Sequence, residues 1–285
     1  MFTLSELKDK YARPQDGSRF INIKGSEIHY RDEGEGFPVL LVHGTSSSLH
    51  TFDGWAAELR KHYRVLRFDL PGFGISNPIP NNDYSLDNYL KIIDDFLEKM
   101  KVTKCHIAGS SLGGWFSWEF VLKYPHRIDK MILIDAAGFI TKEKLPFIYK
   151  VARLPIGRLI FMSVNNRKIF SVFCRGVYGN YRNIEKQVYD RYFELFFRKE
   201  NMDAFLKIAQ NDPFSNSDKL SKIGSPTLIM WGDKDKWVSI NDGHKFEQHI
   251  PKSKLIIYKG LGHVPMEEDP SLTVKDVISF FEGKV

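Results

Sequence analysis

The stretch KCHIAGSSLGG, residues 104–114, decides the fold of this chain. Its first half is a short apolar run, typical of a strand buried on both faces, and its second half opens a helical pattern. Between them lies a G-x-S-x-G pattern, Gly109-Ser110-Ser111-Leu112-Gly113. A strand-to-helix turn this tight leaves no room for side chains at the glycines, and it exposes the hydroxyl of Ser111 above the sheet. The stretch therefore predicts a nucleophilic serine on an α/β scaffold.

The G-x-S-x-G pattern alone is weak evidence, because it arises by chance in about one chain in ten of this length. Catalytic partners of Ser111 elsewhere in the chain make the prediction specific. Of the nine histidines, His263 alone lies in a loop bounded by Gly and Pro, after an apparent strand late in the chain. Asp235 follows the apolar run TLIMW and its turn, and we expect it to fix the tautomer of His263. His263 would then deprotonate Ser111 and later protonate the leaving group.

Two further acids compete with Asp235 for this role. Asp233 precedes it by two residues, and we expect Asp233 to cap the turn. Asp135 lies at the tip of the preceding strand, where we expect a structural hydrogen bond to a neighbouring loop.

An attacking hydroxyl also creates an oxyanion, which needs two preorganised donors. The backbone N–H of Leu112, one residue past the nucleophile, would be one donor. The loop after His43-Gly44 would supply the other, from Thr45. For His43 itself we expect hydrogen bonds that brace this loop rather than proton transfer.

Outside these motifs the chain alternates between strand and helix. Residues 19–34, split at Gly25, predict a hairpin at a sheet edge. Continuous apolar runs predict buried strands at 38–44, 64–70, 104–109, 130–138, 225–232 and 253–260. Helical patterns cover 52–60, 86–100, 112–124, 240–248 and 271–282. This order predicts βαβ units and a mostly parallel twisted sheet flanked by helices.

Residues 139–218 break the alternation. They contain no convincing strand and read as several amphipathic helices rich in Phe, Tyr and Arg. A parallel crossover needs only about a dozen residues. We therefore predict an inserted helical cap, over the sheet edge where α/β proteins bind ligands, on a core made of residues 1–138 and 219–285.

The blocks LLVHGTSSS, FDLPGFGISN, IAGSSLGGW, LIMWGDKDKWV and GLGHVPMEEDP, in the chain order Ser–Asp–His, resemble those of the α/β-hydrolase family. The resemblance covers both parts of the core. It implies a capped hydrolase without a cofactor, with Ser111, Asp235 and His263 as triad and Thr45 and Leu112 as oxyanion donors. The resemblance is strongest to the lipase/esterase-like and C–C-bond hydrolase branches of the family. Haloalkane dehalogenases and epoxide hydrolases of this fold carry a carboxylate where this chain has Ser111.

The residues beside these groups are expected to contact the substrate. They are His43, Gly44, Ser110, Trp237 and Val264.

Composition excludes several other classes of protein. Hydrophobic residues at 42% and charged residues at 27% are ordinary globular values. No apolar run is long enough for a membrane-spanning helix or a secretory signal, and two cysteines cannot form a disulfide framework, so we expect a cytoplasmic protein. No metal-binding spacing, complete nucleotide fingerprint or nucleic-acid module appears, so neither a metal nor a nucleic-acid partner is expected.

The predicted cap carries the chain's excess of positive charge. Residues 141–218 hold 14 Lys and Arg against 8 Asp and Glu, and Lys144 to Ile184 contains eight basic residues and no acidic one. Three interpretations stay open: peripheral contact with anionic membrane lipids, capture of a substrate carboxylate, and a solvated charged face. The cap aromatics could form a lipophilic acyl or aryl pocket or the cap's own small core; they include Phe147, Phe161, Phe170 and Phe173.

Together these features predict a serine hydrolase that cleaves lipophilic carboxylic esters through an acyl-enzyme on Ser111. A C–C hydrolase that cleaves vinylogous diketone acids would use the same triad. Perhydrolysis or acyl transfer to an alcohol, and a non-catalytic binding protein, are further alternatives.

Overall fold

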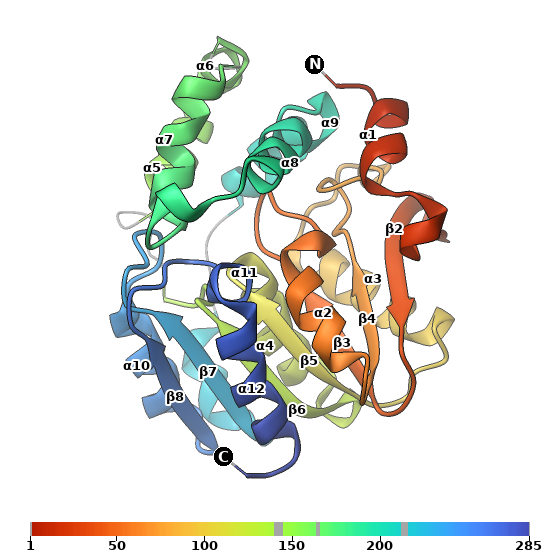
Figure 1. The fold of residues 1–285 in the computed structure, drawn as a ribbon, viewed down its shortest axis with the longest axis vertical. Helices are drawn as coiled ribbons and strands as arrows, with labels where there is room; N and C mark the ends of the chain where they lie inside the picture. Colours follow the sequence, from red (N-terminus) through yellow and green to blue (C-terminus); the bar gives the residue numbers. More distant parts are fainter. Residues whose placement is uncertain (1, 140–144, 164–165, 212–215, 285) are drawn as a thin grey trace.

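An eight-stranded sheet forms the centre of the computed structural model, which describes residues 2–139, 145–163, 166–211 and 216–284 (Figure 1). The strands are β1 (Arg19–Ile23), β2 (Ser26–Glu33), β3 (Pro38–Val42), β4 (Arg64–Phe68), β5 (Cys105–Ser110), β6 (Ile128–Ile134), β7 (Thr227–Gly232) and β8 (Ser253–Tyr258). The helices are α1 (Leu4–Tyr11), α2 (Asp53–Leu59), α3 (Leu86–Lys99), α4 (Leu112–Lys123), α5 (Phe147–Ala152), α6 (Gly157–Ser163), α7 (Arg167–Val177), α8 (Lys186–Phe196), α9 (Lys199–Gln210), α10 (Ile240–His249), α11 (Pro265–Glu268) and α12 (Pro270–Phe281).

The strand order β1-β2-β4-β3-β5-β6-β7-β8 confirms the predicted α/β-hydrolase sheet. β1 and β2 pair antiparallel, as do β2 and β4, and every later pair is parallel. The predicted hairpin turns at Lys24 and Gly25, which have φ of 52° and 83°. Left-handed φ at both central residues matches the twist of the flanking strands, so the hairpin closes in two residues.

The sheet is covered on both faces, as the sequence of β3 shows. Leu40 and Val42 join an apolar cluster with side chains of α3 and α4, whereas Val39 and Leu41 join a second cluster with α2 and α12. Because successive side chains of a strand point to opposite faces, α3 and α4 lie on one face and α2 and α12 on the other. The residues of β3 from Val39 to Val42 therefore face a buried cluster on one side of the sheet or the other, which explains why its apolar run is uninterrupted.

At the edges of the fold one expectation is wrong and one helix was missed. The run at 253–260 was predicted to be buried, but β8 is the last strand of the sheet and Ile257 is 43% exposed. An apolar run alone does not tell an edge strand from a central one. Helix α1 was not predicted, although Thr3 and Glu6 form a capping box at its start.

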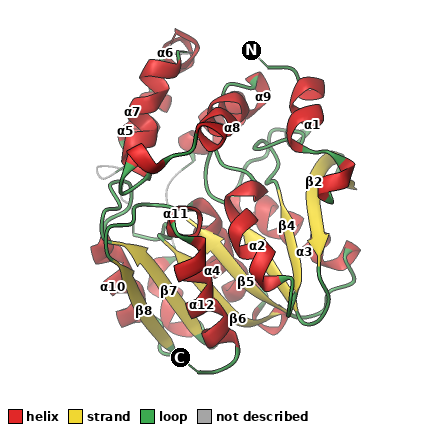
Figure 2. Ribbon diagram, viewed as in Figure 1, coloured by secondary structure: helices red, strands yellow, loops and turns green. Residues whose placement is uncertain are grey.

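Helices α5 to α9 lie between β6 and β7, in the segment predicted to be the cap, and the described residues there form no strand (Figure 2). They cover one end of the sheet, and α6 projects farthest from it (Figure 1). Helix α1 reaches this group as well. Lys10 Nζ and Tyr11 Oη both donate to the carboxylate of Glu194 on α8, and the rings of Phe2 and Phe193 meet edge to face.

Candidate active site

Ser111 occupies the sharp turn between β5 and α4. Its φ of 54° and ψ of −116° are unfavourable for a residue with a Cβ, and such strain is typical of a nucleophile turn. The turn is held by the Ser111 N–H, which donates to the carbonyl of Ile134 at 2.9 Å. A Cβ on Gly113 would lie 2.2 Å from the Val42 carbonyl oxygen, so only glycine lets α4 start this close to β3. The strained turn directs the side chain of Ser111 out of the sheet.

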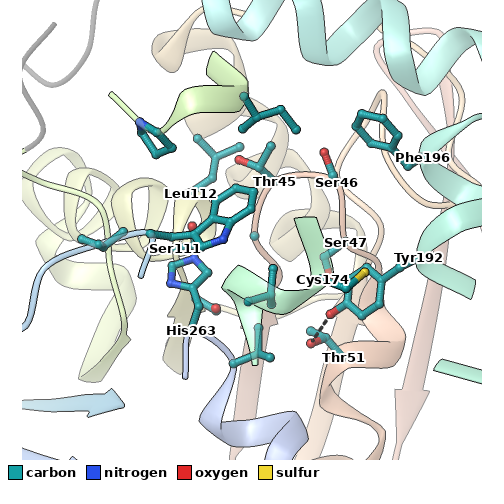
Figure 3. A pocket seen from close by; sticks show the side chains of 18 of the residues that line it. Thr45, Ser46, Ser47, Thr51, Ser111, Leu112, Cys174, Tyr192, Phe196 and His263 are labelled. Carbon is teal, nitrogen blue, oxygen red and sulfur yellow. Dashed lines mark hydrogen bonds between the residues drawn. The ribbon is translucent and has the colours of Figure 1, made fainter. Parts of the chain in front are cut away.

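The structure brings Ser111, His263 and Asp235 together from three different loops. The ring of His263 lies beside the Ser111 hydroxyl (Figure 3). On its other side, His263 Nδ1 donates to Asp235 Oδ2 at 2.7 Å. The second oxygen, Asp235 Oδ1, accepts the N–H groups of Trp237 and Val238. The Asp235 carboxylate is fully buried and held on both oxygens, so it fixes the ring and leaves Nε2 to face the serine.

The two competing acids have other partners. Asp233 accepts the N–H of Gly260 at 2.6 Å, so it joins the loop before His263 instead of capping its own turn. Asp135 accepts the N–H of Gly232 at 3.0 Å, the expected kind of hydrogen bond to a neighbouring loop. Its other oxygen is buried and finds no partner among the described residues. Burial and the nearby charge of Asp235 raise the pKa of Asp135 well above its usual range.

Asp135, Asp235 and His263 are also the described residues whose spacing would allow a metal ion, with one ligand atom of each within 4.8 Å of the others. His263 Nδ1 and both oxygens of Asp235 already take part in hydrogen bonds, and these orient the imidazole for its role beside Ser111.

The loop after β3 lies against the nucleophile. A Cβ on Gly44 would stand 3.0 Å from Ser111 Cβ, so the loop can approach this closely because residue 44 is glycine. The backbone N–H groups of Thr45 and Leu112 donate to no other described residue, and both residues line the cavity at Ser111. Two unpaired N–H groups beside an exposed hydroxyl are the arrangement an oxyanion needs.

His43 braces this loop and does not line the cavity, so its placement among the substrate contacts was wrong. The Leu70 N–H donates to His43 Nε2, which leaves the proton on Nδ1 to donate to the Gly44 carbonyl at 2.7 Å. With both ring nitrogens used and the side chain fully buried, His43 has nothing left to offer a substrate.

Asp69 fixes the other end of the same loop. Its carboxylate accepts the N–H groups of Leu49 and Ile75 and the ring of His29. Burial alone would raise the pKa of Asp69, but its electrostatic interaction and hydrogen bond with the His29 ring hold it well below the usual range. The oxyanion loop is therefore clamped at both ends by buried polar groups.

The cavity above Ser111 has a volume of about 1140 Å³ with the open space at its mouth included, and it is lined by residues of the core and of helices α5, α7, α8 and α9. Four of the predicted substrate contacts lie there: Gly44, Ser110, Trp237 and Val264. Trp237 also stacks on the ring of His263. The described lining contains Ser, Thr and Tyr hydroxyls and many apolar side chains but, apart from His263, no ionisable acid or base other than tyrosine and cysteine.

Sequence reasoning missed several hydroxyl groups in this lining. Tyr149 on α5 shares a hydrogen bond of 2.6 Å with the side chain of Thr45, which ties the segment over the cavity to the oxyanion loop. The hydroxyls of Ser46 and Ser47 are buried without a partner among the described residues, and both line the cavity. The run TSSS after the glycine was the available signal for the serines; no local pattern marks Tyr149.

The cap aromatics divide between several roles. Phe170 lines the cavity, Phe161 packs within the core of the helices above the sheet, and Phe147 is exposed. The side chain of Phe173 lies outside the described ones. Cys174, like Cys105 a buried free thiol, also lines the cavity.

A second hollow, the outer cleft, lies behind one wall of this cavity. Thr51, Tyr178 and Met266 line both spaces. Within this wall the Glu267 carboxylate of α11 accepts hydrogen bonds from Tyr192, Thr51 and Arg191. Because α11 directly follows His263, this network joins α8 to the segment that carries the histidine.

Comparison with known proteins agrees with this geometry. A family model of the α/β-hydrolase fold matches residues 38–270. A 2-hydroxy-6-oxononadienedioate/2-hydroxy-6-oxononatrienedioate hydrolase from Klebsiella pneumoniae is 28% identical over 263 residues, which cover 86% of this chain and 89% of that protein. The names of such relatives agree better with C–C hydrolysis, the alternative drawn from the sequence, than with ester hydrolysis.

Solved structures share the fold. A meta-cleavage product hydrolase from Pseudomonas fluorescens superposes with a TM-score of 0.82 at 22% identity, over 94% of this chain and 98% of its own. A membrane phospholipase A superposes with a TM-score of 0.80 at 23% identity, over 99% of this chain and 91% of its own. In the described part of this chain, no helix is both long and apolar enough to cross a bilayer.

Proposed function

The chain belongs to the α/β-hydrolase family, and from that premise we propose that it hydrolyses carboxylic esters of apolar acyl groups through an acyl-enzyme on Ser111. One observation carries the choice of substrate: no Lys, Arg, Asp or Glu lines the described part of the cavity that holds Ser111. A charged substrate would have to leave water for a space without a counter-ion, at a cost of several kcal/mol. An uncharged acyl chain gains free energy on entering the same space.

Acylation uses the groups in the positions described. His263 Nε2 takes the proton of Ser111 Oγ while the oxygen attacks the ester carbonyl, and Asp235 stabilises the imidazolium that forms. The carbonyl electrons move onto its oxygen, where the N–H groups of Thr45 and Leu112 receive them. The intermediate then expels the alkoxide, which takes the proton from His263 and leaves as the alcohol.

Deacylation repeats these steps with water as the nucleophile. His263 takes a proton from water, hydroxide adds to the acyl carbon, and Ser111 leaves with the proton returned from His263. The products are the carboxylic acid and the regenerated serine. Among the described residues, the apolar lining opposite the triad would hold the acyl chain through both halves of the reaction.

Hydrolysis of a C–C bond is a second candidate, which the names of the sequence relatives favour. The substrates in those names are dienedioates, which carry two carboxylates. Arg191, on the cap helix beside Tyr192, is the sort of cation that would bind a carboxylate, but it is ion-paired with Glu267 and lines the outer cleft instead. The unpaired cation that this reaction calls for is missing from the described lining, which supports the ester.

The experiment compares both reactions on the same protein. p-Nitrophenyl esters from acetate to palmitate test ester cleavage, and a 2-hydroxy-6-oxohexa-2,4-dienoate, followed by loss of its absorbance, tests C–C cleavage. Ser111→Ala should lower kcat by about 10⁶-fold. Ser279→Ala, the same change on α12, is the matched control and should keep wild-type activity. A fluorophosphonate probe should label Ser111, with the labelled peptide mapped.

Ester turnover with an optimum at medium or long acyl chains, lost in Ser111→Ala, is the expected result. Turnover of the dienoate at a kcat/KM above that of every ester would make C–C hydrolysis the function. Residual ester activity of Ser111→Ala within tenfold of wild type would remove Ser111 from the mechanism.

A further inference from the structure

Exposed large apolar side chains are concentrated on one part of the surface, the hairpin of α5 and α6 with its connection. Leu154, Ile156 and Leu159 are 48%, 56% and 67% exposed, and Phe147 is 74% exposed. These four are half of the strongly exposed large apolar side chains among the described residues, and they include the three most exposed. They fall within thirteen residues of the chain. We call them the apolar tip. Such a concentration marks an interaction surface, whereas single exposed apolar residues do not.

The surroundings of the apolar tip are basic. Lys150 on α5 and Lys168 at the start of α7 are exposed and form no ion pair with another described residue. Arg158 is half exposed and pairs with Asp203, and Arg167 pairs with Asp190. The pairing acids come from α8 and α9, since the segment from Lys144 to Ile184 has none of its own. Lys150, between Phe147 and Leu154 in the chain, thus adds to the apolar tip a positive charge that has no ion-pair partner among the described residues.

The same hairpin forms part of the wall of the cavity. On α5, Phe147 and Lys150 face solvent, whereas Ile148 and Tyr149 between them line the cavity above Ser111. Leu145 and Pro146, just before the helix, line it too. One short helix therefore lies between the outside surface and the space beside the catalytic serine.

We propose that the apolar tip docks on an anionic phospholipid bilayer, with Leu154, Ile156, Leu159 and Phe147 inserted at the boundary between headgroups and acyl chains and with Lys150 and Lys168 at the lipid phosphates. Basic residues beside bulky apolar ones are the composition of surface-bound membrane helices. The charge complements an anionic surface, whereas a second copy of this chain would bring the same positive charge to the contact. Docking here also places the α5 wall of the cavity against the lipid, the phase in which a lipophilic substrate is dissolved.

Vesicle flotation of the full chain tests this docking. Vesicles of phosphatidylcholine alone are compared with vesicles that contain a third phosphatidylglycerol, for wild type and for a variant with Leu154→Ser, Ile156→Ser and Leu159→Ser together. The matched control carries Ile257→Ser and Leu272→Ser, on β8 and α12, which are also exposed apolar residues but lie outside the apolar tip. Thermal melting of each variant shows that it is folded, independently of any enzymatic activity.

Wild type and control should bind the anionic vesicles at least tenfold more tightly than the neutral ones, and the triple variant should lose at least tenfold of that affinity. Lys150→Glu and Lys168→Glu should each lower it by about fivefold or more, and added salt should weaken binding further. Equal binding of wild type and the triple variant, or no binding of wild type to anionic vesicles, would overturn the proposal. So would a triple variant that changes only self-association in sedimentation. None of these readouts depends on whether the chain cleaves esters, so the failure of one proposal leaves the other to its own test.

Discussion

The two hollows of this molecule share a wall and differ in how they treat charge. The cavity above Ser111 has no Lys, Arg, Asp or Glu in its described lining, whereas Lys, Arg, Asp and Glu make up almost half of the lining of the outer cleft. Yet Thr51, Tyr178 and Met266 line both spaces, so the two lie directly against each other.

In the outer cleft several of the charges are paired. Arg191 pairs with Glu267, and Arg31 lies beside Asp53. The first of these pairs joins α8 to α11, beside the segment that carries His263. This fold therefore keeps ion pairing and apolar binding in adjacent but separate spaces.

The largest effect is expected where one charge does serve the cavity, at Asp235. Asp235→Asn should lower kcat by about 10⁴-fold, because an amide can hold the His263 ring in the wrong tautomer. Steady-state turnover of the best ester measures this. Asp233→Asn, the same change two residues earlier on a group bonded to Gly260, should stay within a few fold of wild type. Equal losses in the two variants would mean that the loop, and not the carboxylate, matters.

Removing one member of a matched pair in the wall should be costly for stability. Glu267→Ala leaves Arg191 buried without its counter-ion, so the free energy of unfolding should fall by about 3–5 kcal/mol. Denaturant unfolding followed by tryptophan fluorescence measures it. Glu247→Ala, on a more exposed glutamate of α10 that bonds only the N–H of Leu255, serves as control and should cost about 1 kcal/mol. A loss at position 267 no larger than this control would show that the wall does not depend on the ion pair.

A charge placed in the cavity should damage binding of apolar chains. Cys174 lines the cavity, and burial raises the pKa of its thiol to about 12, so the native side chain is uncharged at neutral pH. Cys174→Asp should lower kcat/KM for a medium-chain ester by about 100-fold, because an unpaired carboxylate is costly to bury. Cys174→Ser, a neutral change at the same site, should have a much smaller effect. If both variants cleave the ester as wild type does, the apolar lining does not select the substrate.

The smallest effect concerns Asp135, a buried carboxyl that forms no ion pair with a described Lys or Arg and whose second oxygen has no partner among the described residues. Its folded pKa is raised above the unfolded value of about 3.9, so the folded state binds the proton more tightly. Stability must therefore fall as pH rises from about 4 toward the folded pKa. Asp135→Asn removes this slope, and its melting temperature should gain on wild type by a few degrees between pH 5 and pH 8.

Asp129→Asn provides the control of opposite sign. Its hydrogen bond with Lys104 lowers the pKa of Asp129, so that carboxylate is already ionised at pH 5 and the difference from wild type should stay constant up to pH 8. A constant difference for Asp135→Asn as well would show that Asp135 is ionised in the folded protein.

Features of the structure that depend on neighbouring residues in the chain were predictable from the sequence, and features that depend on residues far apart were not. Ser111, His263 and Asp235 were predictable because short patterns at strand ends fix their position, and parallel strands bring those ends to one edge. The burial of β3 on both faces was predictable because its run of apolar residues is uninterrupted. Whether an apolar strand lies at the edge of the sheet, as β8 does, depends on which strands pair. Strand pairing is a long-range property that a local sequence pattern does not specify.

The cap shows the limit more sharply. Amphipathic spacing indicated helices, but the same Phe and Tyr content could form a pocket or a packed core, and the structure uses Phe170 for the first and Phe161 for the second. Tyr149 meets Thr45 across 104 positions of sequence, and Glu267 meets Arg191 across 76. Contacts of this kind follow from how one helix is laid over another, which is settled only once the whole chain has packed.

The contact of helix α1 with Glu194 has a mechanical consequence. Helices α5 to α9 are already joined to the rest of the chain by the hydrogen bond of Tyr149 with Thr45 and by the contacts of α8 with Glu267. Lys10 and Tyr11 add an attachment from the N-terminal helix, at Glu194 on α8. A movement of α8 away from the sheet therefore requires that this attachment be released as well. Removing the residues of α1 should therefore make α8 more mobile, although α1 does not line the cavity at Ser111.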